Sequence, residues 1–249
     1  AALPASLVAG VGGACPGEAA GPSAAEPALR EMPAERRVAT NHSFTGRMCA
    51  ASRWEETNRP DSLFQDRLAR KLAGQEGMAS PMGAWILVPR TRFGDDFLQW
   101  HYDEGGCRQL VLLGAGMDAR AWRLTHMPEL RVFEVDQQTT FDVKEPLVRG
   151  EALTVHSREV VGTEFGGSRR RWAEDLLAKG FDTSVPTVWL LEGLLMYLSM
   201  DDTHALMELV GGLSASGSAV FHDAITHTHL GARISVAGAP FIGGGGGEG

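Results

Sequence analysis

A short glycine loop is the part of this sequence whose residue types and spacing could do chemistry. The segment from Leu113 to Ala119 (LGAGMDA) follows an apolar run and precedes a predicted helix. Gly114 permits a tight turn, and Gly116 lets the backbone approach a ligand closely. The helix N-terminus behind the loop favours a negatively charged group. The loop is therefore a candidate site for a nucleotide cofactor.

A carboxylate follows the loop at the spacing that a ribose contact requires. Asp136 comes 20 residues after Gly116, at the end of the next predicted strand, and can accept hydrogen bonds from both ribose hydroxyls. Written as GxGxxA, the loop also satisfies the NAD fingerprint. Two features favour S-adenosylmethionine over NAD. Helices are predicted before the loop, and Glu192 follows the fourth predicted strand, where it can face a cationic cofactor or a ribose.

Alternating strands and helices must position these residues. Short apolar runs predict strands at 110–113, 131–135, either 153–155 or 160–161, 187–191 and 218–222. Helical spacing of apolar residues predicts helices at 62–72, 92–102, 119–124, around 172–177, and 200–213. Strands that alternate with helices predict an α/β fold, with a doubly wound, mostly parallel sheet and helices on both faces.

Composition limits the classes to which the protein can belong. The chain has 249 residues and a net charge of -8, which fits one domain and argues against a nucleic-acid binder. No stretch approaches the roughly 18 uncharged apolar residues of a membrane-spanning helix, so no membrane partner is expected. The three cysteines are widely separated and form no CxxC pair. They indicate reduced thiols, and we expect a cytoplasmic protein.

Composition also divides the chain into three parts. Residues 1–35 are rich in Ala, Gly and Pro and are predicted to form a disordered leader, because they bury too little apolar surface to offset ordering. The folded domain is expected to span 36–242. Residues 243–249 form a glycine-rich tail with the composition of a flexible linker.

Five motifs, in order, resemble those of the leucine carboxyl methyltransferase family, and within it the bacterial-type S-adenosylmethionine-dependent methyltransferases. They are the segment 53–66 with RPDSLFQD, PRTRFGDD at 89–96, QLVLLGAGMDARAWRL at 109–124, VFEVDQ at 132–137 and WLLEGLLMYL at 189–198. The resemblance implies a Rossmann-like class I methyltransferase fold with S-adenosylmethionine as cofactor. It also implies that the C-terminal strands of the family are missing from this chain.

The resemblance implies cofactor-binding roles for particular residues. Arg90 matches an arginine that binds the carboxylate of the cofactor, which suits bidentate guanidinium geometry. Arg53 matches a second basic contact. Gly114 and Gly116 match the loop under the methionine moiety, and Asp136 matches the acid that binds the ribose.

Two further roles lie after the third and fourth strands. Glu192 matches an acid that contacts the cofactor. Glu164 and Phe165 take the place of an Asp and an apolar residue that hold the adenine amino group. Glutamate accepts the same hydrogen bond, but its extra methylene shifts the oxygen. This contact is therefore a departure from the family pattern.

The implied reaction is in-line transfer of a methyl group to a carboxylate or hydroxyl of a small molecule or a protein. A carboxylate needs no general base. A hydroxyl needs one, for which His222 and Asp223 are candidates, although both residues can instead cap the end of a strand. Tyr197 can line the acceptor pocket or simply pack with its hydroxyl at the surface. No catalytic residue is assigned.

Two rival functions stay open at this point. The first is an NAD-dependent oxidoreductase that uses the same glycine loop. The second is a non-catalytic relative that retains the methyltransferase fold, which the glutamate at position 164 makes conceivable. A metal site is not expected, because the HxH sequence at 227–229 has no further ligands that complete a set.

Overall fold

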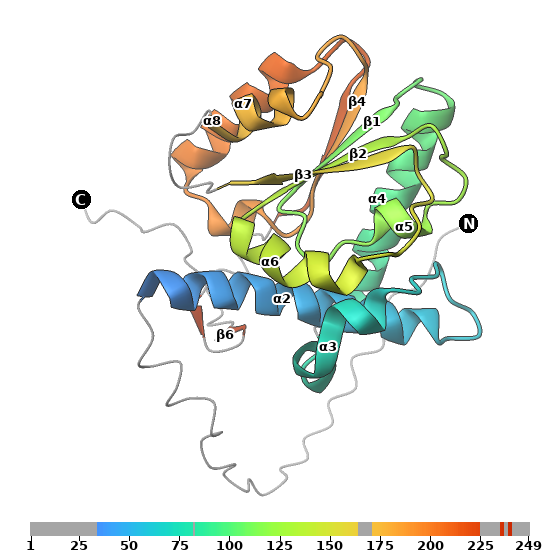
Figure 1. Cartoon of the computed structure of the whole chain (residues 1–249), viewed down its shortest axis with the longest axis vertical. Helices are drawn as coiled ribbons and strands as arrows, with labels where there is room; N and C mark the ends of the chain where they lie inside the picture. Colours follow the sequence, from blue (N-terminus) through green and yellow to red (C-terminus); the bar gives the residue numbers. More distant parts are fainter. Residues whose placement is uncertain (1–33, 82, 164–170, 225–234, 237–238, 241–249) are drawn as a thin grey trace, which may run out of the picture.

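A five-stranded parallel sheet forms the centre of the fold (Figure 1). The strands are β1 Gln109–Leu113, β2 Arg131–Asp136, β3 Ser157–Gly162, β4 Thr187–Leu191 and β5 Ala219–His222. They lie in the order β3-β2-β1-β4-β5, and each neighbouring pair is parallel. The computed structural model describes residues 34–81, 83–163, 171–224, 235–236 and 239–240.

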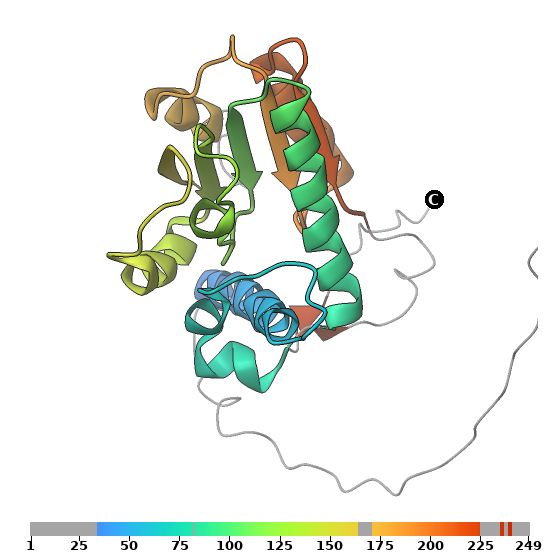
Figure 2. The same ribbon diagram turned by 90° about the vertical axis from the view of Figure 1, so that its right-hand side faces the viewer.

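Helices cover both faces of this sheet (Figure 2). They are α2 Ala34–Thr57, α3 Ala69–Ala79, α4 Ala84–Asp103, α5 Arg120–Arg123, α6 Gln138–Val148, α7 Arg171–Ala178, the 3-10 helix η1 Leu195–Tyr197 and α8 Met200–Leu213. Side chains of α4, α5 and α6 join the core on one face, and those of α7 and α8 join it on the other. The predicted Rossmann-like α/β fold is confirmed.

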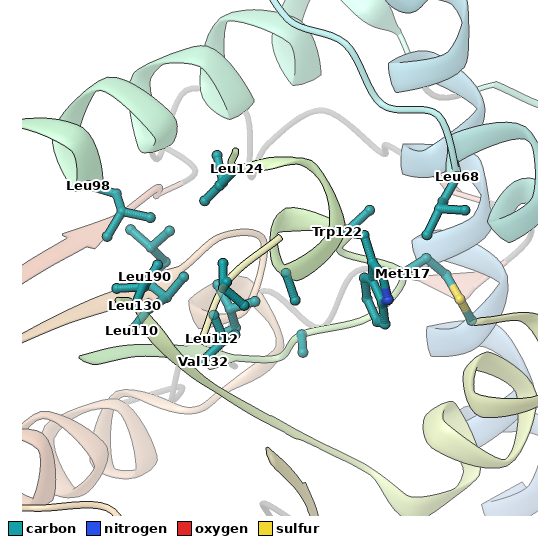
Figure 3. Close-up of a cluster of buried hydrophobic side chains, with 14 of the residues drawn as sticks. Leu68, Leu98, Leu110, Leu112, Met117, Trp122, Leu124, Leu130, Val132 and Leu190 are labelled. Carbon is teal, nitrogen blue, oxygen red and sulfur yellow. The ribbon is translucent and has the colours of Figure 1, made fainter. Parts of the chain in front are cut away.

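The alternation of side chains along β1 divides the core into two layers. Leu110 and Leu112 belong to the layer under α4 and α5, where Figure 3 shows them beside Leu98 and Val132. Val111 belongs with the side chains of α7 and α8 on the opposite face. All five residues of β1 are buried, as expected for a strand covered on both faces. The rigid centre of the sheet therefore carries the loop that follows β1.

The order of the strands places a topological switch point between β1 and β4. The chain passes from β1 to β2 and β3 in one direction, and then returns to place β4 on the other side of β1. The connections after β1 and β4 therefore diverge at their carboxyl ends, which is where open α/β sheets bind ligands. Gly114 and Glu192 are the first residues after these two strands.

Helix α2 crosses this carboxyl edge and contacts the loop after β1 (Figure 1). A Cβ on Gly46 of α2 would lie 3.3 Å from the backbone nitrogen of Met117 and 3.6 Å from Gly116 Cα. Such a close approach makes α2 one wall of any site built at the loop. The sequence did not indicate this helix, because its buried face is formed by small residues such as Ala50 and Ala51 and not by an apolar stripe.

The helix predicted at 62–72 is wrong in its first half, since α3 begins at Ala69. Polar side chains take the backbone hydrogen bonds that a helix would use: the amide of Leu63 donates to Glu56 Oε1 at 2.6 Å. This competition disfavours the helix locally. Leu63 is also 48% exposed, so the apolar periodicity at its position does not mark a buried face.

The other predicted elements agree more closely with the structure. Helix 92–102 lies within the longer α4, and strand β3 includes 160–161, not 153–155. Helix α6 was not predicted. A separate antiparallel pair is formed by β6 Ser235–Val236 and β7 Ala239–Pro240. Most of the predicted leader (1–33) and the whole glycine-rich tail (243–249) lie outside the described residues.

Candidate functional site

The glycine loop adopts backbone conformations that favour glycine. Gly114 has a φ of +72° and Gly116 a φ of +48°, both in the left-handed region. A Cβ on Gly114 would lie 3.2 Å from Leu194 Cδ1, so this position is closely packed. A Cβ on Gly116 would meet only Gly46 Cα at 3.8 Å and Gly114 O at 3.9 Å. The backbone at Gly116 therefore faces space that the protein itself does not fill tightly.

Asp136 holds this loop directly, as its position at the end of β2 allows. Its Oδ2 accepts a hydrogen bond from the Gly116 amide at 2.7 Å, and its Oδ1 accepts from Gln137 N at 2.6 Å and Thr140 Oγ1 at 2.9 Å. Burial raises the pKa of Asp136 above its ordinary value, although these three hydrogen bonds favour the charged form. The two residues that the sequence linked by spacing are thus in contact.

Two buried polar atoms near Asp136 lack a hydrogen-bond partner among the described residues. They are Gln137 Oε1, at the end of β2, and Thr163 Oγ1, which follows β3. The Thr163 amide donates to the Asp136 carbonyl at 2.8 Å, so Thr163 lies beside the predicted ribose position. Buried polar groups normally have partners. These two atoms therefore point to a polar ligand. Glu164 and Phe165 lie outside the described residues.

Arg90 of α4 reaches the ends of β4 and β5. Its Nη1 donates to Asp223 Oδ2 at 2.8 Å, and Asp223 Oδ1 accepts from the Gly193 amide at 2.6 Å. Arg90 Nε lies 3.7 Å from Glu192 Oε2, which is too far for a hydrogen bond. Arg90 Nε is buried and has no hydrogen-bond partner in the described part of the chain. Arg90 and Glu192 thus form an adjacent pair of opposite charges with unfilled hydrogen-bonding capacity.

The two candidate bases at the end of β5 have different surroundings. Asp223 Oδ2 accepts a hydrogen bond from Arg90 and Oδ1 accepts one from the Gly193 amide, which is the arrangement expected of a residue that caps the end of a strand. His222 is exposed.

Tyr197 lies in η1 and forms a hydrogen bond with Thr45 of α2. Burial raises its pKa, and the hydrogen bond partly opposes that rise. Its hydroxyl is therefore tied to the helix that crosses the carboxyl edge.

Arg53 of α2 anchors the glycine loop. Its side chain is 9% exposed, its Nε pairs with Asp66 Oδ2 at 2.8 Å, and its Nη2 donates to the Met117 carbonyl. These contacts fasten the glycine loop to α2 and to the segment before α3. To contact a cofactor as predicted, the Arg53 guanidinium would have to keep these hydrogen bonds and also bind the ligand. The cofactor contact stays a prediction.

Sequence reasoning missed the buried charges that surround Glu192. Arg120 of α5 contacts Glu192 Oε1 at 2.6 Å, Asp118 at 2.6 Å and Asp95 at 2.8 Å. Arg123 also pairs with Asp95, at 2.6 Å. The motifs PRTRFGDD and GAGMDARAWRL contain these residues, but their charges alone do not say which of them meet. Only the fold brings α4, the glycine loop and β4 together.

The remaining candidate features of the sequence add no site. No group of His, Cys, Asp and Glu suitable for a metal ion occurs among the described residues, and positions 227–229 lie outside them. Within the part of the chain that the structure describes, no helix combines the length and apolar character of a membrane span.

Several known proteins resemble this chain over the same region. The family described as leucine carboxyl methyltransferase matches residues 47–211. Two Streptomyces coelicolor proteins, both provisionally named S-adenosyl-L-methionine-dependent methyltransferases, are 38% identical over 178 residues and 37% identical over 199 residues. These matches cover 66% and 72% of this chain. The chain spans only 62% and 65% of the lengths of these two relatives.

A solved structure supports the same fold. The crystal structure of a provisionally named methyltransferase from Thermobifida fusca matches with a TM-score of 0.51 and 18% identity, over 74% of this chain and 66% of that one. At this level of identity the match supports the fold alone. The family match, by contrast, covers more than half of the sequence and includes the glycine loop, Asp136 and Glu192. The chain therefore belongs to the leucine carboxyl methyltransferase family.

Proposed function

We propose that this chain acts as an S-adenosylmethionine-dependent methyltransferase on an oxygen acceptor. The observation that carries the proposal is the gathering of three features at one edge of the sheet. They are the glycine loop bonded to Asp136, the pair of Arg90 and Glu192 that lacks a mutual hydrogen bond, and the buried atoms of Gln137 and Thr163 that have no partner among the described residues. The names of the Streptomyces relatives point to the same cofactor.

The Arg90–Glu192 pair suits the amino-acid end of S-adenosylmethionine. A zwitterion carries a carboxylate for a guanidinium and an ammonium for a carboxylate. Arg90 Nε and Glu192 Oε2 lie 3.7 Å apart without a hydrogen bond between them, so each retains capacity for such a partner. Two adjacent charges of opposite sign would bind a zwitterion without net repulsion.

The other end of the cofactor would lie toward β2 and β3. Asp136 would accept from a ribose hydroxyl, and Gln137 Oε1 and Thr163 Oγ1 would gain the partners that they lack. Three of the hydrogen bonds that the Asp136 carboxylate can accept are already used. We therefore expect it to bind one ribose hydroxyl more strongly than the second. Glu164 and Phe165, which follow Thr163, would complete the adenine contact.

S-adenosylmethionine supplies a methyl group on a sulfonium, which is electrophilic without activation by the protein. An oxygen lone pair of the acceptor forms the new C–O bond while the C–S electron pair returns to sulfur. The task of the protein is then to position the acceptor in line and to exclude water. A carboxylate acceptor requires no proton transfer, whereas a hydroxyl acceptor would require a base.

The rival cofactor is NAD, which also fits the glycine loop. A nicotinamide dinucleotide has no zwitterionic amino-acid group for the Arg90–Glu192 pair. Isothermal titration calorimetry with S-adenosylhomocysteine and with NAD decides between the two. We expect binding of S-adenosylhomocysteine alone. Binding of NAD alone would overturn the proposal.

Turnover needs a separate measurement, because a non-catalytic relative would also bind the cofactor. The protein is incubated with cell extract and S-adenosylmethionine that carries an isotopically labelled methyl group, and the products are identified by mass spectrometry. A labelled ester or ether that needs the active protein is expected. Cofactor binding without any labelled product would favour the non-catalytic alternative.

The role of Asp136 can be tested in the same calorimeter. Asp136→Ala should weaken binding of S-adenosylhomocysteine by about 1–3 kcal/mol, the size of a lost buried charged hydrogen bond. Part of this loss would come from the Gly116 amide, which also loses its acceptor. Unchanged affinity in the folded variant would remove Asp136 from the site.

A further inference from the structure

Arg120 joins three separate segments of the chain through a single guanidinium. Its side chain is only 1% exposed, and it pairs with Asp95 of α4, Asp118 of the glycine loop and Glu192 after β4. We call these four residues the Arg120 network. Burial alone would lower the pKa of Arg120, but the three carboxylates raise it well above its ordinary value. The guanidinium therefore stays charged at the centre of the network.

The network determines how the Glu192 carboxylate is oriented. Arg120 Nη2 donates to Glu192 Oε1 at 2.6 Å, while Oε2 lies 3.7 Å from Arg90 Nε without a hydrogen bond. Gly94 allows α4 to come this close, since a Cβ there would collide with Glu192 Oε1 and lie 2.8 Å from Arg120 Nη2. One oxygen of Glu192 is thus held by Arg120, and the other is left beside Arg90.

Glutamate has three side-chain torsions, and a free carboxylate beside an arginine would tend to form a hydrogen-bonded salt bridge with it. Such hydrogen bonds between Glu192 and Arg90 would use the atoms that a zwitterion needs. Arg120, which is itself paired with Asp95 and Asp118, can hold Glu192 in an ion pair with Arg90 at 3.7 Å, without a hydrogen bond, before any ligand arrives. Preorganisation of this kind lowers the ordering cost of binding.

We propose that Arg120 is a positioning residue that fixes Glu192, so that the Arg90–Glu192 pair can receive the amino-acid end of S-adenosylmethionine. The proposal rests on the proposed function above. It differs from a purely structural role in one respect. Loss of Arg120 should weaken cofactor binding through Glu192, and not merely lower the stability of the fold.

Arg120→Lys is the variant that tests the proposal, because a lysine keeps the charge but lacks the planar, five-donor fork through which Arg120 reaches three separate carboxylates. The matched control is Arg158→Lys. Arg158 is also a buried arginine that pairs with carboxylates. It lies near the amino end of β3, in register with Val132 of β2, and therefore away from the carboxyl ends of the strands. Both variants should be less stable to urea. Affinity for S-adenosylhomocysteine should fall about tenfold or more in Arg120→Lys, and it should stay unchanged in Arg158→Lys.

A double-mutant cycle shows whether Arg120 acts through Glu192. Calorimetry is repeated on Glu192→Gln and on the double variant, with folding checked by circular dichroism. If the role is positioning, the double variant binds about as weakly as Glu192→Gln, because the two changes remove one interaction. Losses that simply multiply would overturn the proposal. So would equal losses in Arg120→Lys and Arg158→Lys.

Two further results separate this proposal from the one on which it rests. Wild-type protein that binds no S-adenosylhomocysteine would overturn both. Wild-type binding that is retained in full by Arg120→Lys would overturn the positioning role alone. Should Arg120→Lys not fold, Asp95→Asn removes an anchor of Arg120 and leaves Arg120 and Glu192 in place. Full affinity in that variant would also overturn the proposal.

Discussion

Two buried charge networks in this protein have opposite designs. In the Arg120 network a cation is surrounded by three carboxylates at the carboxyl edge of the sheet. In the second, which we call the flank network, Glu134 of β2 is an anion held between Lys144 of α6 and Arg158 of β3, at 2.6 and 2.7 Å. The Glu134 and Lys144 side chains are fully buried, so burial itself does not distinguish the two.

The surroundings of the two networks do distinguish them. Glu134 uses both oxygens, since Arg158 donates to Oε1 and Oε2 and Lys144 donates to Oε2. Arg158 also lies over the ring of Trp122, with 4.6 Å from Cζ to the ring centroid. Glu192 of the Arg120 network instead lies beside Arg90 Nε, which has no hydrogen-bond partner among the described residues. Unfilled hydrogen-bonding capacity at the carboxyl ends of the strands, and not buried charge, therefore marks the site.

The largest expected effect is on the flank network. Glu134→Gln leaves Lys144 buried without a counter-charge and should destabilise the protein by about 3–5 kcal/mol. Guanidinium unfolding measures the loss. The control is the triple variant Glu134→Leu, Lys144→Met and Arg158→Leu, in which no buried charge is left unpaired and most of the stability should return. Only the part-exposed Glu145 loses its partner, Arg158.

The same proteins test whether the flank network is separate from the site. The triple variant should bind S-adenosylhomocysteine as the wild type does. A clear loss of affinity in a fully folded triple variant would contradict the distinction between the two networks.

A smaller effect is expected at Asp118, and it depends on pH. Burial raises the pKa of this carboxyl, but nearby cations, led by Arg120 and Arg123, lower it to about 2. A pKa below the value in the unfolded chain means that the stabilisation is complete above about pH 5. It declines as the pH falls below about 5 and is lost only below about pH 2. Asp118→Asn should therefore cost about 2 kcal/mol at pH 7 and progressively less as the pH falls toward 2.5.

Urea unfolding of both proteins between pH 7 and pH 2.5 measures this difference. Asp142→Asn, on the exposed face of α6, is the surface control and should follow the wild-type curve. Parallel curves for wild type and Asp118→Asn across the whole range would show that the Arg120 network does not depend on this carboxylate.

The sequence predicted the parts of the molecule that local pattern determines. Continuous apolar runs located β1 and β4, because strands covered on both faces are mostly apolar. Strand β2 was located by the apolar residues on either side of Glu134. The spacing of Gly116 and Asp136 predicted that both residues belong to one site, and in the structure the Gly116 amide donates to the Asp136 carboxylate at 2.7 Å. Gly116 follows β1 and Asp136 ends β2, and the carboxyl ends of these neighbouring parallel strands lie side by side.

The rest depended on contacts between distant segments. Helix α2 was missed because it packs through small residues, and the 62–72 helix was overpredicted because side chains such as Glu56 take its backbone hydrogen bonds. The Arg120 network could not be predicted either. Asp95, Asp118 and Glu192 lie up to 97 residues apart in the sequence. Charged residues follow no sequence pattern from which their ion-pair partners can be predicted.

The smallest expected effect concerns the packing of the glycine loop. Gly114 and Gly106 both have positive φ, at +72° and +66°. A Cβ on Gly106 would meet nothing within 4 Å, whereas a Cβ on Gly114 would press on Leu194 at 3.2 Å. Replacement of either glycine by alanine should cost about 1 kcal/mol of stability from backbone strain alone.

Only Gly114→Ala should also weaken binding of S-adenosylhomocysteine, because Leu194 follows the segment that carries Glu192 and must move to admit the new methyl group. Unfolding measures the loss of stability that backbone strain causes in both variants, and calorimetry measures whether the affinity for S-adenosylhomocysteine also changes. Equal affinity in Gly114→Ala and Gly106→Ala would mean that Leu194 can shift without moving Glu192, although both residues lie in the segment directly after β4. The Arg120 network would then be rigid enough to hold the carboxylate against a displaced neighbour. A loss of affinity confined to Gly114→Ala would instead show that the glycine loop and the segment after β4 position Glu192 together.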